Sequence, residues 1–183
     1  MFRNIKIFVP IMAVMMLSFG ASDLRADDEV ARAEERADLL AALKAAPNEQ
    51  VANAAVSAIW EHWQTAPDEK AQKLLDSARQ RMRVADFDGA MEHLDELVAY
   101  APDYSEGWNT RATTLFLQQK YDRSLEDVIK TLELEPAHFG ALTGRAIILM
   151  RQGRVGMSQR ALRRAVEVNP YLRERSLLIE PKE

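Results

Sequence analysis

The sequence predicts an all-α fold in which pairs of short helices repeat and stack as a solenoid. Three observations predict it: evenly spaced prolines, apolar residues at helical spacing between them, and no long alternation of apolar and polar residues. The chain of 183 residues is 48% hydrophobic and 28% charged, which excludes a disordered tail or a collagen-like repeat. We expect a divergent N-terminal hairpin before the repeats and a short capping helix after them.

Residues 1–26 have the organisation of a secretory signal peptide. Arg3 and Lys6 precede an apolar run over residues 7–19, and small residues follow it. This run is shorter than the ~20 residues that a membrane-spanning helix needs, and it contains Pro10. Three cleavage positions are candidates: Gly20, Ser22 and Ala26. We predict export to the bacterial periplasm with no membrane span after cleavage, and an uncleaved anchor is the alternative.

Residues 27–67 are predicted to form the divergent N-terminal hairpin. Its two helices are expected over residues 29–45 and 48–65, because Pro47 and Pro67 interrupt helical geometry. The second helix carries an apolar stripe that ends at Trp63. Since this pair does not match the columns of the repeats, we expect it to dock on the first repeat.

A repeating unit of about 34 residues organises the remaining chain. Pro102, Pro136 and Pro170 close successive units, and a polar turn separates two helices in each. The first helices are predicted over residues 71–83, 105–118 and 139–151, and the outer two second helices over residues 88–100 and 156–169. The middle second helix is expected to be capped by Asp122. Small residues recur where the paired helices would touch: Ala78, Ala90, Ala112, Ser124, Ala146 and Ser158.

These columns resemble the tetratricopeptide repeat, with Trp108, Ala112, Leu115 and Pro136 marking the pattern in the middle unit. The resemblance implies three repeats, over residues 71–104, 105–138 and 139–172, followed by a cap and tail over residues 173–183. It also implies that Trp108 is covered by hairpins on both sides. Two arginines stand where the family usually has leucine, so an arginine stem is expected to replace one core contact: Arg111 and Arg145.

Charge is distributed unevenly along the chain. Residues 27–69 carry a net charge of −7, residues 137–183 carry +5, and the whole chain carries −4. A mildly acidic protein has no general attraction to nucleic acid, so no nucleic-acid partner is expected. The basic C-terminal end is interpreted as a solvated helix face. The alternative is a self-associating structural protein, in which the acidic end of one chain meets the basic end of another.

No residue constellation predicts catalysis, a metal site or a cofactor. The chain has no Cys, and its three histidines, at 62, 93 and 138, are interpreted as surface or helix-end residues. The carboxylate pairs Asp95–Glu96 and Glu126–Asp127 are expected to be solvated. Trp60 and Trp63 are three residues apart on a predicted helix, so we expect them to pack a hairpin interface, whereas a ligand cage is the alternative. We predict a non-enzymatic protein without cofactors.

The resemblance implies a functional surface in the concave groove lined by the first helices. Methionine and aromatic side chains suit an apolar peptide, and arginines suit a nearby carboxylate, so the expected partner is an unidentified envelope protein or peptide. The predicted groove residues are Leu75, Arg79, Arg83, Asn109, Thr113, Phe116, Thr143, Ile147 and Met150. For Phe116 and Met150, packing between repeats is the alternative. The family's clamp for chaperone tails is not matched, because Gly140 and Gly144 occupy two of its positions.

Overall fold

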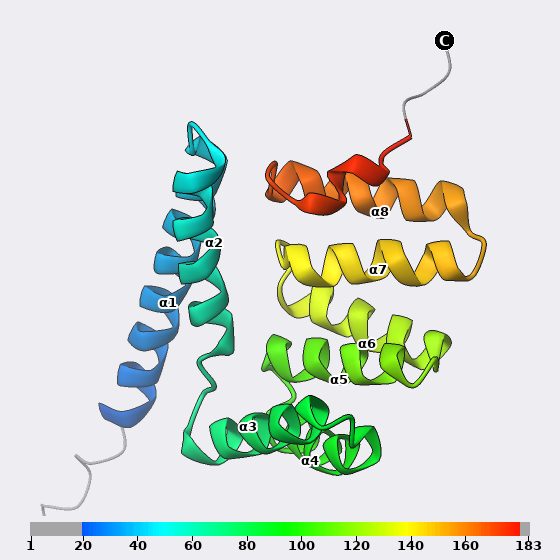
Figure 1. Ribbon diagram of the computed structural model, residues 1–183. Coiled ribbons are helices and arrows are strands. Elements are labelled where there is room, and N and C mark those ends of the chain that lie inside the picture. The colour runs from blue at the N-terminus through cyan, green and yellow to red at the C-terminus, as the bar shows by residue number, and fades with distance from the viewer. Residues whose placement is uncertain (1–19, 180–183) are drawn as a thin grey trace, which may run out of the picture. The chain divides into compact units, whose positions relative to one another are not determined.

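The computed structural model describes residues 20–179, which contain helices and no strand (Figure 1). The prediction of an all-α fold is confirmed. The elements are α1 (Gly20–Ala45), α2 (Glu49–Gln64), α3 (Glu69–Arg83), α4 (Phe87–Tyr100), α5 (Ser105–Leu117), α6 (Tyr121–Leu134), α7 (Phe139–Arg151), α8 (Val155–Val168) and the 3-10 helix η1 (Arg173–Leu177).

Helix α1 starts earlier than the predicted residue 29, at Gly20, so the three candidate cleavage positions lie in its first two turns. The apolar run of the predicted signal peptide lies outside the described residues. No helix within residues 20–179 is long and apolar enough to cross a membrane. The chain divides into two units, residues 1–38 and residues 39–183, and the second unit contains α2 to α8 and η1.

Helices α3 and α4, α5 and α6, and α7 and α8 form three hairpins, and α4 packs on α5 as α6 packs on α7. The predicted small residues are all buried at the contacts within the hairpins. Ser124 and Ser158 each donate a hydrogen bond of 2.7 Å to the carbonyl of the facing alanine, Ala112 or Ala146. The predicted small residues at the helix contacts are therefore confirmed, and the two serine hydroxyls have hydrogen-bond partners inside the hairpins.

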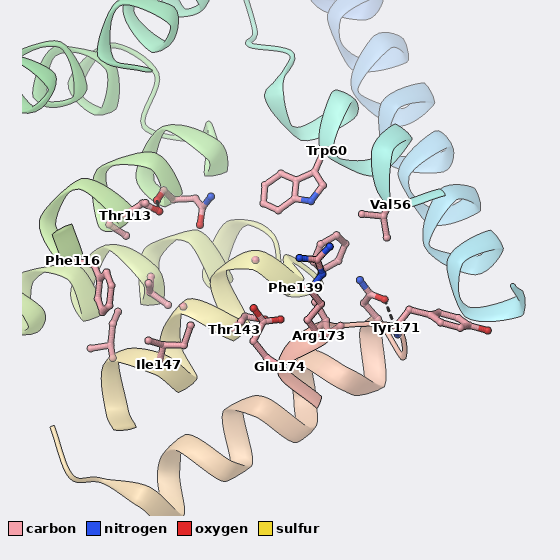
Figure 2. Close-up of a pocket in the computed structure, with 18 of the residues that line it drawn as sticks. Val56, Trp60, Thr113, Phe116, Phe139, Thr143, Ile147, Tyr171, Arg173 and Glu174 are labelled. Carbon is pink, nitrogen blue, oxygen red and sulfur yellow. Dashed lines mark hydrogen bonds between the residues drawn. The ribbon is translucent and has the colours of Figure 1, made fainter. Parts of the chain in front are cut away.

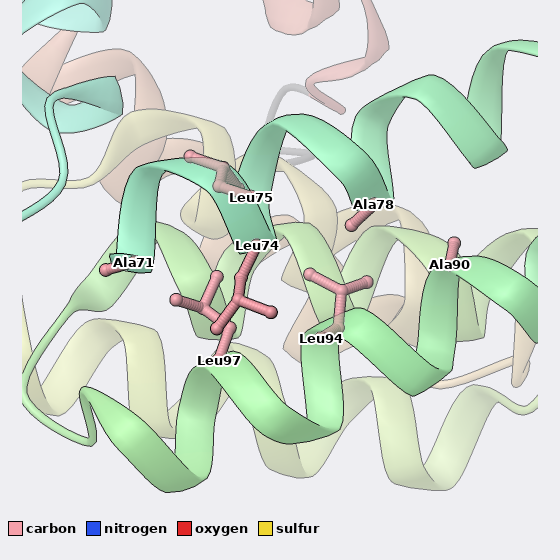
Figure 3. Close-up of a cluster of buried hydrophobic side chains, with 7 residues drawn as sticks. All are labelled: Ala71, Leu74, Leu75, Ala78, Ala90, Leu94 and Leu97. Carbon is pink, nitrogen blue, oxygen red and sulfur yellow. The ribbon is translucent and has the colours of Figure 1, made fainter. Parts of the chain in front are cut away.

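The core of the first hairpin shows why the pattern folds in this way (Figure 3). Leu74 and Leu75 of α3 pack against Leu94 and Leu97 of α4. Alanines at the crossing of the two helices allow their backbones to approach, and the leucines fill the remaining space. Tyr104, which precedes α5, packs against this core. Each hairpin thus buries its apolar face only because a neighbour covers it.

The turns inside the hairpins repeat as strictly as the helices do. Ala85, Gln119 and Gly153 have φ values of 58°, 61° and 72°, and they occupy the same position in successive repeats. Each therefore adopts the left-handed conformation that turns the chain from the first helix into the second. Only the third turn uses glycine, for which this conformation carries no steric cost.

The N-terminal hairpin docks elsewhere than predicted. Ile59 and Trp63 of α2 form one buried cluster with Phe139, the first residue of α7, and Tyr171 packs against that cluster. The Tyr171 hydroxyl also donates a hydrogen bond of 2.7 Å to the carbonyl of Ala46. The expectation that this hairpin docks on the first repeat is corrected: its apolar stripe reaches the third hairpin, where large apolar side chains are available to cover it.

Two further expectations are corrected, and the predicted short capping helix is present as a 3-10 helix. Trp108 is only half-buried, and its indole N–H donates to the carbonyl of Pro102 in an exposed position. Asp122 does not cap α6, whose N-cap residue is Lys120; instead Asp122 accepts a 2.7 Å hydrogen bond from Gln152 in the next hairpin. The predicted capping helix is one short 3-10 helix, Arg173–Leu177, and the backbone at its end bonds to Gln159 of α8.

Candidate functional site

A cleft of about 460 Å³ lies between α2 and the first helices of the second and third hairpins, α5 and α7 (Figure 2). Helix α2 contributes Val56 and Trp60 to one wall, and α5 contributes Phe116 to another. The segment after α8, including Tyr171, borders it as well. The cleft is therefore built from parts of the second unit that are far apart in the sequence.

Two glycines of α7 determine how much space the cleft holds. A Cβ atom at Gly140 would lie 2.6 Å from the ring of Trp60, so glycine is what lets the indole approach α7. A Cβ atom at Gly144, one turn later, would meet nothing within 4 Å. Gly144 thus leaves open space beside the apolar side chains of Phe116 and Ile147, where a side chain from another molecule could lie.

The charged residues of the cleft are of both signs. Glu49, Arg173 and Glu174 line it together with Asn53 and Asn109. Opposite charges are both present, so the cleft has no strong preference for one sign of charge. The Oγ1 atom of Thr143, which also lines the cleft, is buried without a hydrogen-bond partner in the structure. The lining combines an apolar body with polar groups that can orient a bound segment.

An aromatic cluster supports the α2 wall. The His138 ring stacks on Trp63 with centroids 3.9 Å apart and planes 11° apart, and Trp60 meets His138 and Phe139 edge-on. His138 lies at a helix end, as predicted, because its Nδ1 accepts from the Ala141 N–H and caps α7. It is nevertheless fully buried, which the sequence did not predict. The tryptophans pack an interface, as expected, and it joins α2 to α7.

Beneath this cluster, the buried carboxylate of Glu106 connects three hairpins. It accepts a 2.8 Å hydrogen bond from Arg79 of α3 and another of 2.8 Å from Asn109 of α5. Its Oε2 atom also lies 3.2 Å from Nε2 of His138. Because Nδ1 of His138 acts as an acceptor, Nε2 carries the proton and donates to Glu106. Glu106 is 3% exposed, so these donors replace the water that a carboxylate needs.

The structure brings together five of the nine predicted groove residues and separates the others. The cleft is lined by Asn109, Thr113, Phe116, Thr143 and Ile147. The prediction for Leu75 is wrong, since it is fully buried in the core of the first hairpin. The remaining three, Arg79, Arg83 and Met150, do not line the cleft.

Sequence reasoning missed the α2 wall and the C-terminal border. From the sequence, Trp60 is expected to pack an interface or line a ligand cage, and Phe139 is expected only to start a helix. One signal was present in the sequence: Gly140, the second residue of a predicted helix, has no side chain and leaves room for another group to approach closely. That signal does not indicate which group approaches, so Trp60 could not be assigned to it.

On another surface, Arg111 is held by carboxylates of two hairpins. Its Nε and Nη2 donate to both oxygens of Asp127 at 2.8 and 2.7 Å, and its Nη1 donates to Asp95 at 3.0 Å. These hydrogen bonds, the ones to Asp127 foremost, raise the pKa of the Arg111 guanidinium. The guanidinium also lies 4.7 Å from the Trp108 ring centroid. The expectation that Asp127 is solvated is corrected, since this ion pair buries it.

Solved structures share this arrangement of hairpins. The first TPR of Spaghetti (RPAP3), bound to the HSP90 peptide SRMEEVD, matches with a TM-score of 0.58 and 16% identity over 60% of this chain and 86% of that one. The TPR2B domain of yeast Sti1, in complex with Hsp70, matches with a TM-score of 0.56 and 20% identity over 60% and 91%. This chain has a tetratricopeptide-repeat fold. MamA resembles it over 84% of this chain and 96% of its own, with a TM-score of 0.53 and 13% identity.

A sequence relative agrees with this TPR fold. A TPR repeat-containing protein of Rhizobium etli is 42% identical over 81 residues, which is 44% of this chain and 40% of that protein. The chain thus spans less than half the length of the curated relative it matches. No protein-family model matches the sequence. Within residues 20–179, no group of three or more His, Asp or Glu side chains is placed to hold a metal ion.

Proposed function

We propose that this TPR solenoid is a non-catalytic binding module that holds a segment of another protein by a bulky apolar side chain inserted into the cleft. The observation that carries the proposal is the open space at Gly144, which Phe116 and Ile147 border with apolar surface. Solvent in such a space is readily displaced by an aromatic or aliphatic side chain. Support comes from the structural neighbours, one of which was solved bound to an HSP90 peptide and another as a complex with pHsp70.

The chemistry of the cleft favours an apolar anchor over a terminal carboxylate. Arg79 occupies one of the clamp positions, but it is already paired with Glu106 at 2.8 Å. The clamp positions on α7 are glycines, which supply no donor side chain. The Asn53 side chain at the cleft can instead bond to the backbone of a bound segment and orient it.

A peptide-display selection on the full chain tests this proposal. Selected peptides should be enriched in Trp, Phe or Leu and should bind Gly144→Leu at least about tenfold more weakly, about 1.4 kcal/mol, because leucine fills the space. The matched control is Gly156→Leu, since Gly156 lies near the start of α8 outside the cleft and a Cβ there meets only a distant Arg160 atom at 3.9 Å. Equal binding by the two variants would place the binding surface elsewhere.

We propose further that the protein acts outside the cytoplasm, in the periplasm. The support is the order of charged, apolar and small residues within residues 1–26. The N-terminal sequence and intact mass of protein from the cell envelope test this. A chain that begins after Gly20, Ser22 or Ala26 supports export, whereas Met1 retained in the membrane fraction indicates an anchored protein.

A further inference from the structure

The second and third repeats contain the same arginine in two different settings. Arg111 of α5 and Arg145 of α7 occupy equivalent positions in successive repeats. Arg111 is saturated: Asp127 holds it through two hydrogen bonds, Asp95 holds it through a third, and Trp108 lies against its guanidinium. The second repeat therefore shows what this position of the fold can bind, namely carboxylates from two sides.

In the third repeat, the carboxylates are gone and the arginine remains. The residues that follow Asp95 and Asp127 by one full repeat are Ile129 and Ala161. Within residues 20–179, Arg145 makes no hydrogen bond or ion pair, and its Nε atom is buried without a partner. Ile129 is 42% exposed, so its side chain presents apolar surface to the solvent.

A guanidinium that is partly removed from water without a counter-ion lowers stability, because its lost hydration is not replaced. A carboxylate from another molecule would compensate for the lost hydration. A planar guanidinium is suited to bidentate pairing with a carboxylate. The exposed Ile129 side chain would provide an apolar contact beside that ion pair.

We infer that Arg145 and Ile129 form a second binding surface, which takes an acidic segment of a protein partner that presents Asp or Glu next to an apolar residue. Neither residue lines the cleft, so this surface is distinct from the one in the proposed function. The chain itself holds carboxylates in this way at Arg111. Binding at the second surface does not require that the cleft binds a peptide.

The test follows the side-chain Nε–H resonance of Arg145 by NMR in the isotope-labelled full chain. The probe is acetyl-Leu-Asp-amide, and acetyl-Leu-Asn-amide is its uncharged control. We expect a saturable shift with the aspartyl probe and at least about tenfold weaker binding of the asparaginyl probe, equivalent to about 1.4 kcal/mol. The Arg111 resonance should stay in place, because its donors are already used.

Two variants separate the site from general charge effects. Ile129→Asp recreates the carboxylate that Asp95 supplies to Arg111, so it should occupy Arg145 from within the chain and weaken the probe at least about tenfold. The matched control is Arg160→Gln, which removes an exposed arginine of α8 and should leave probe binding unchanged. The inference is overturned if both probes shift Arg145 alike, if neither does, or if Ile129→Asp binds the aspartyl probe as the natural chain does.

Discussion

At the scale of single residues, the charged side chains with the largest effect on the free energy of unfolding are the buried ones. Arg79 was predicted to face a partner in the groove, but it donates to Glu106, a carboxylate that is 3% exposed. Asn109 donates to the same carboxylate. Both residues therefore stabilise the fold, and replacing them should change the free energy of unfolding as well as any binding.

Replacing Arg79 with Ala should lower the free energy of unfolding by about 1–3 kcal/mol, because a buried carboxylate loses its cationic donor. Arg83→Ala is the matched control. It lies one helical turn away and is exposed, so it should change stability by less than ~0.5 kcal/mol. Urea denaturation of the two variants provides the comparison, and equal losses would contradict the role of Glu106.

The left-handed turn residues lead to a second prediction. Gln119 has a φ of 61° at the position where the third repeat has Gly153. A non-glycine residue in this conformation costs about 1–2 kcal/mol, and the extra freedom of glycine in the unfolded chain offsets up to ~1 kcal/mol of that. Gln119→Gly should therefore raise the stability by up to ~1 kcal/mol. A lower midpoint of urea denaturation would show that the Gln119 side chain stabilises the turn.

At the scale of helices, side chains near the helix ends connect one hairpin to the next. Asp88 near the start of α4 accepts a 2.7 Å hydrogen bond from Gln118, which follows α5. Asp122 near the start of α6 accepts an equivalent 2.7 Å bond from Gln152, which follows α7. Such aspartates look like helix caps in the sequence, yet they act between hairpins.

One helix cap makes the stability of the fold depend on pH. Asp68 caps α3 by accepting from the Ala71 N–H at 2.9 Å and also accepts from the Tyr100 hydroxyl of α4 at 2.8 Å. These two hydrogen bonds, the first foremost, lower the pKa of Asp68 below its ordinary value of 3.8. The carboxylate therefore stabilises the folded state fully above pH 3.8, and this contribution disappears as the pH falls through the lower folded-state value.

Urea denaturation of the natural chain and of Asp68→Asn, at neutral pH and at steps below pH 3.8, measures this contribution. The difference in stability between the two should shrink as the solution becomes more acidic. The control variant is Asp103→Asn, which changes an exposed aspartate outside this cap. A constant difference for Asp68→Asn at all pH values would assign its effect to packing.

At the scale of the whole second unit, α2 and the segment after α8 turn a repeat surface into a cleft. Trp63 stacks on His138, and Tyr171 bonds to Ala46, so residues far apart in the sequence close the same region. The uneven charge of the chain remains a separate property. Arg164 of the basic end pairs with Glu167 at 3.1 Å, and Arg163 donates to the Ile179 carbonyl.

Head-to-tail association of the acidic and basic ends remains a prediction at this scale. If it occurs, sedimentation velocity at low salt should show larger species that dissociate at high salt, because salt screens contacts between exposed charges. Arg160→Glu together with Arg164→Glu should then prevent association at low salt. Sedimentation as a monomer at both salt concentrations would contradict it.

The sequence by itself determined the helices, the repeat and the contacts inside each hairpin. These features are local or periodic: Phe139–Arg151 was predicted with its exact bounds, and the small residues at Ala112 and Ser124 meet as their spacing predicted. Periodicity reports which face of a helix is apolar, and helix pairs of fixed length leave few ways to stack them.

Only the tertiary structure decided which faces meet across long separations. The burial of Glu106 and His138, the half-exposure of Trp108 and the place of Trp60 above Gly140 all depend on how α2 and the hairpins pack. The sequence around a glutamate or histidine on a helix does not show whether water or a protein side chain is its hydrogen-bond partner. The choice is made by partners that are distant along the chain, since desolvation and ion pairing depend on three-dimensional proximity.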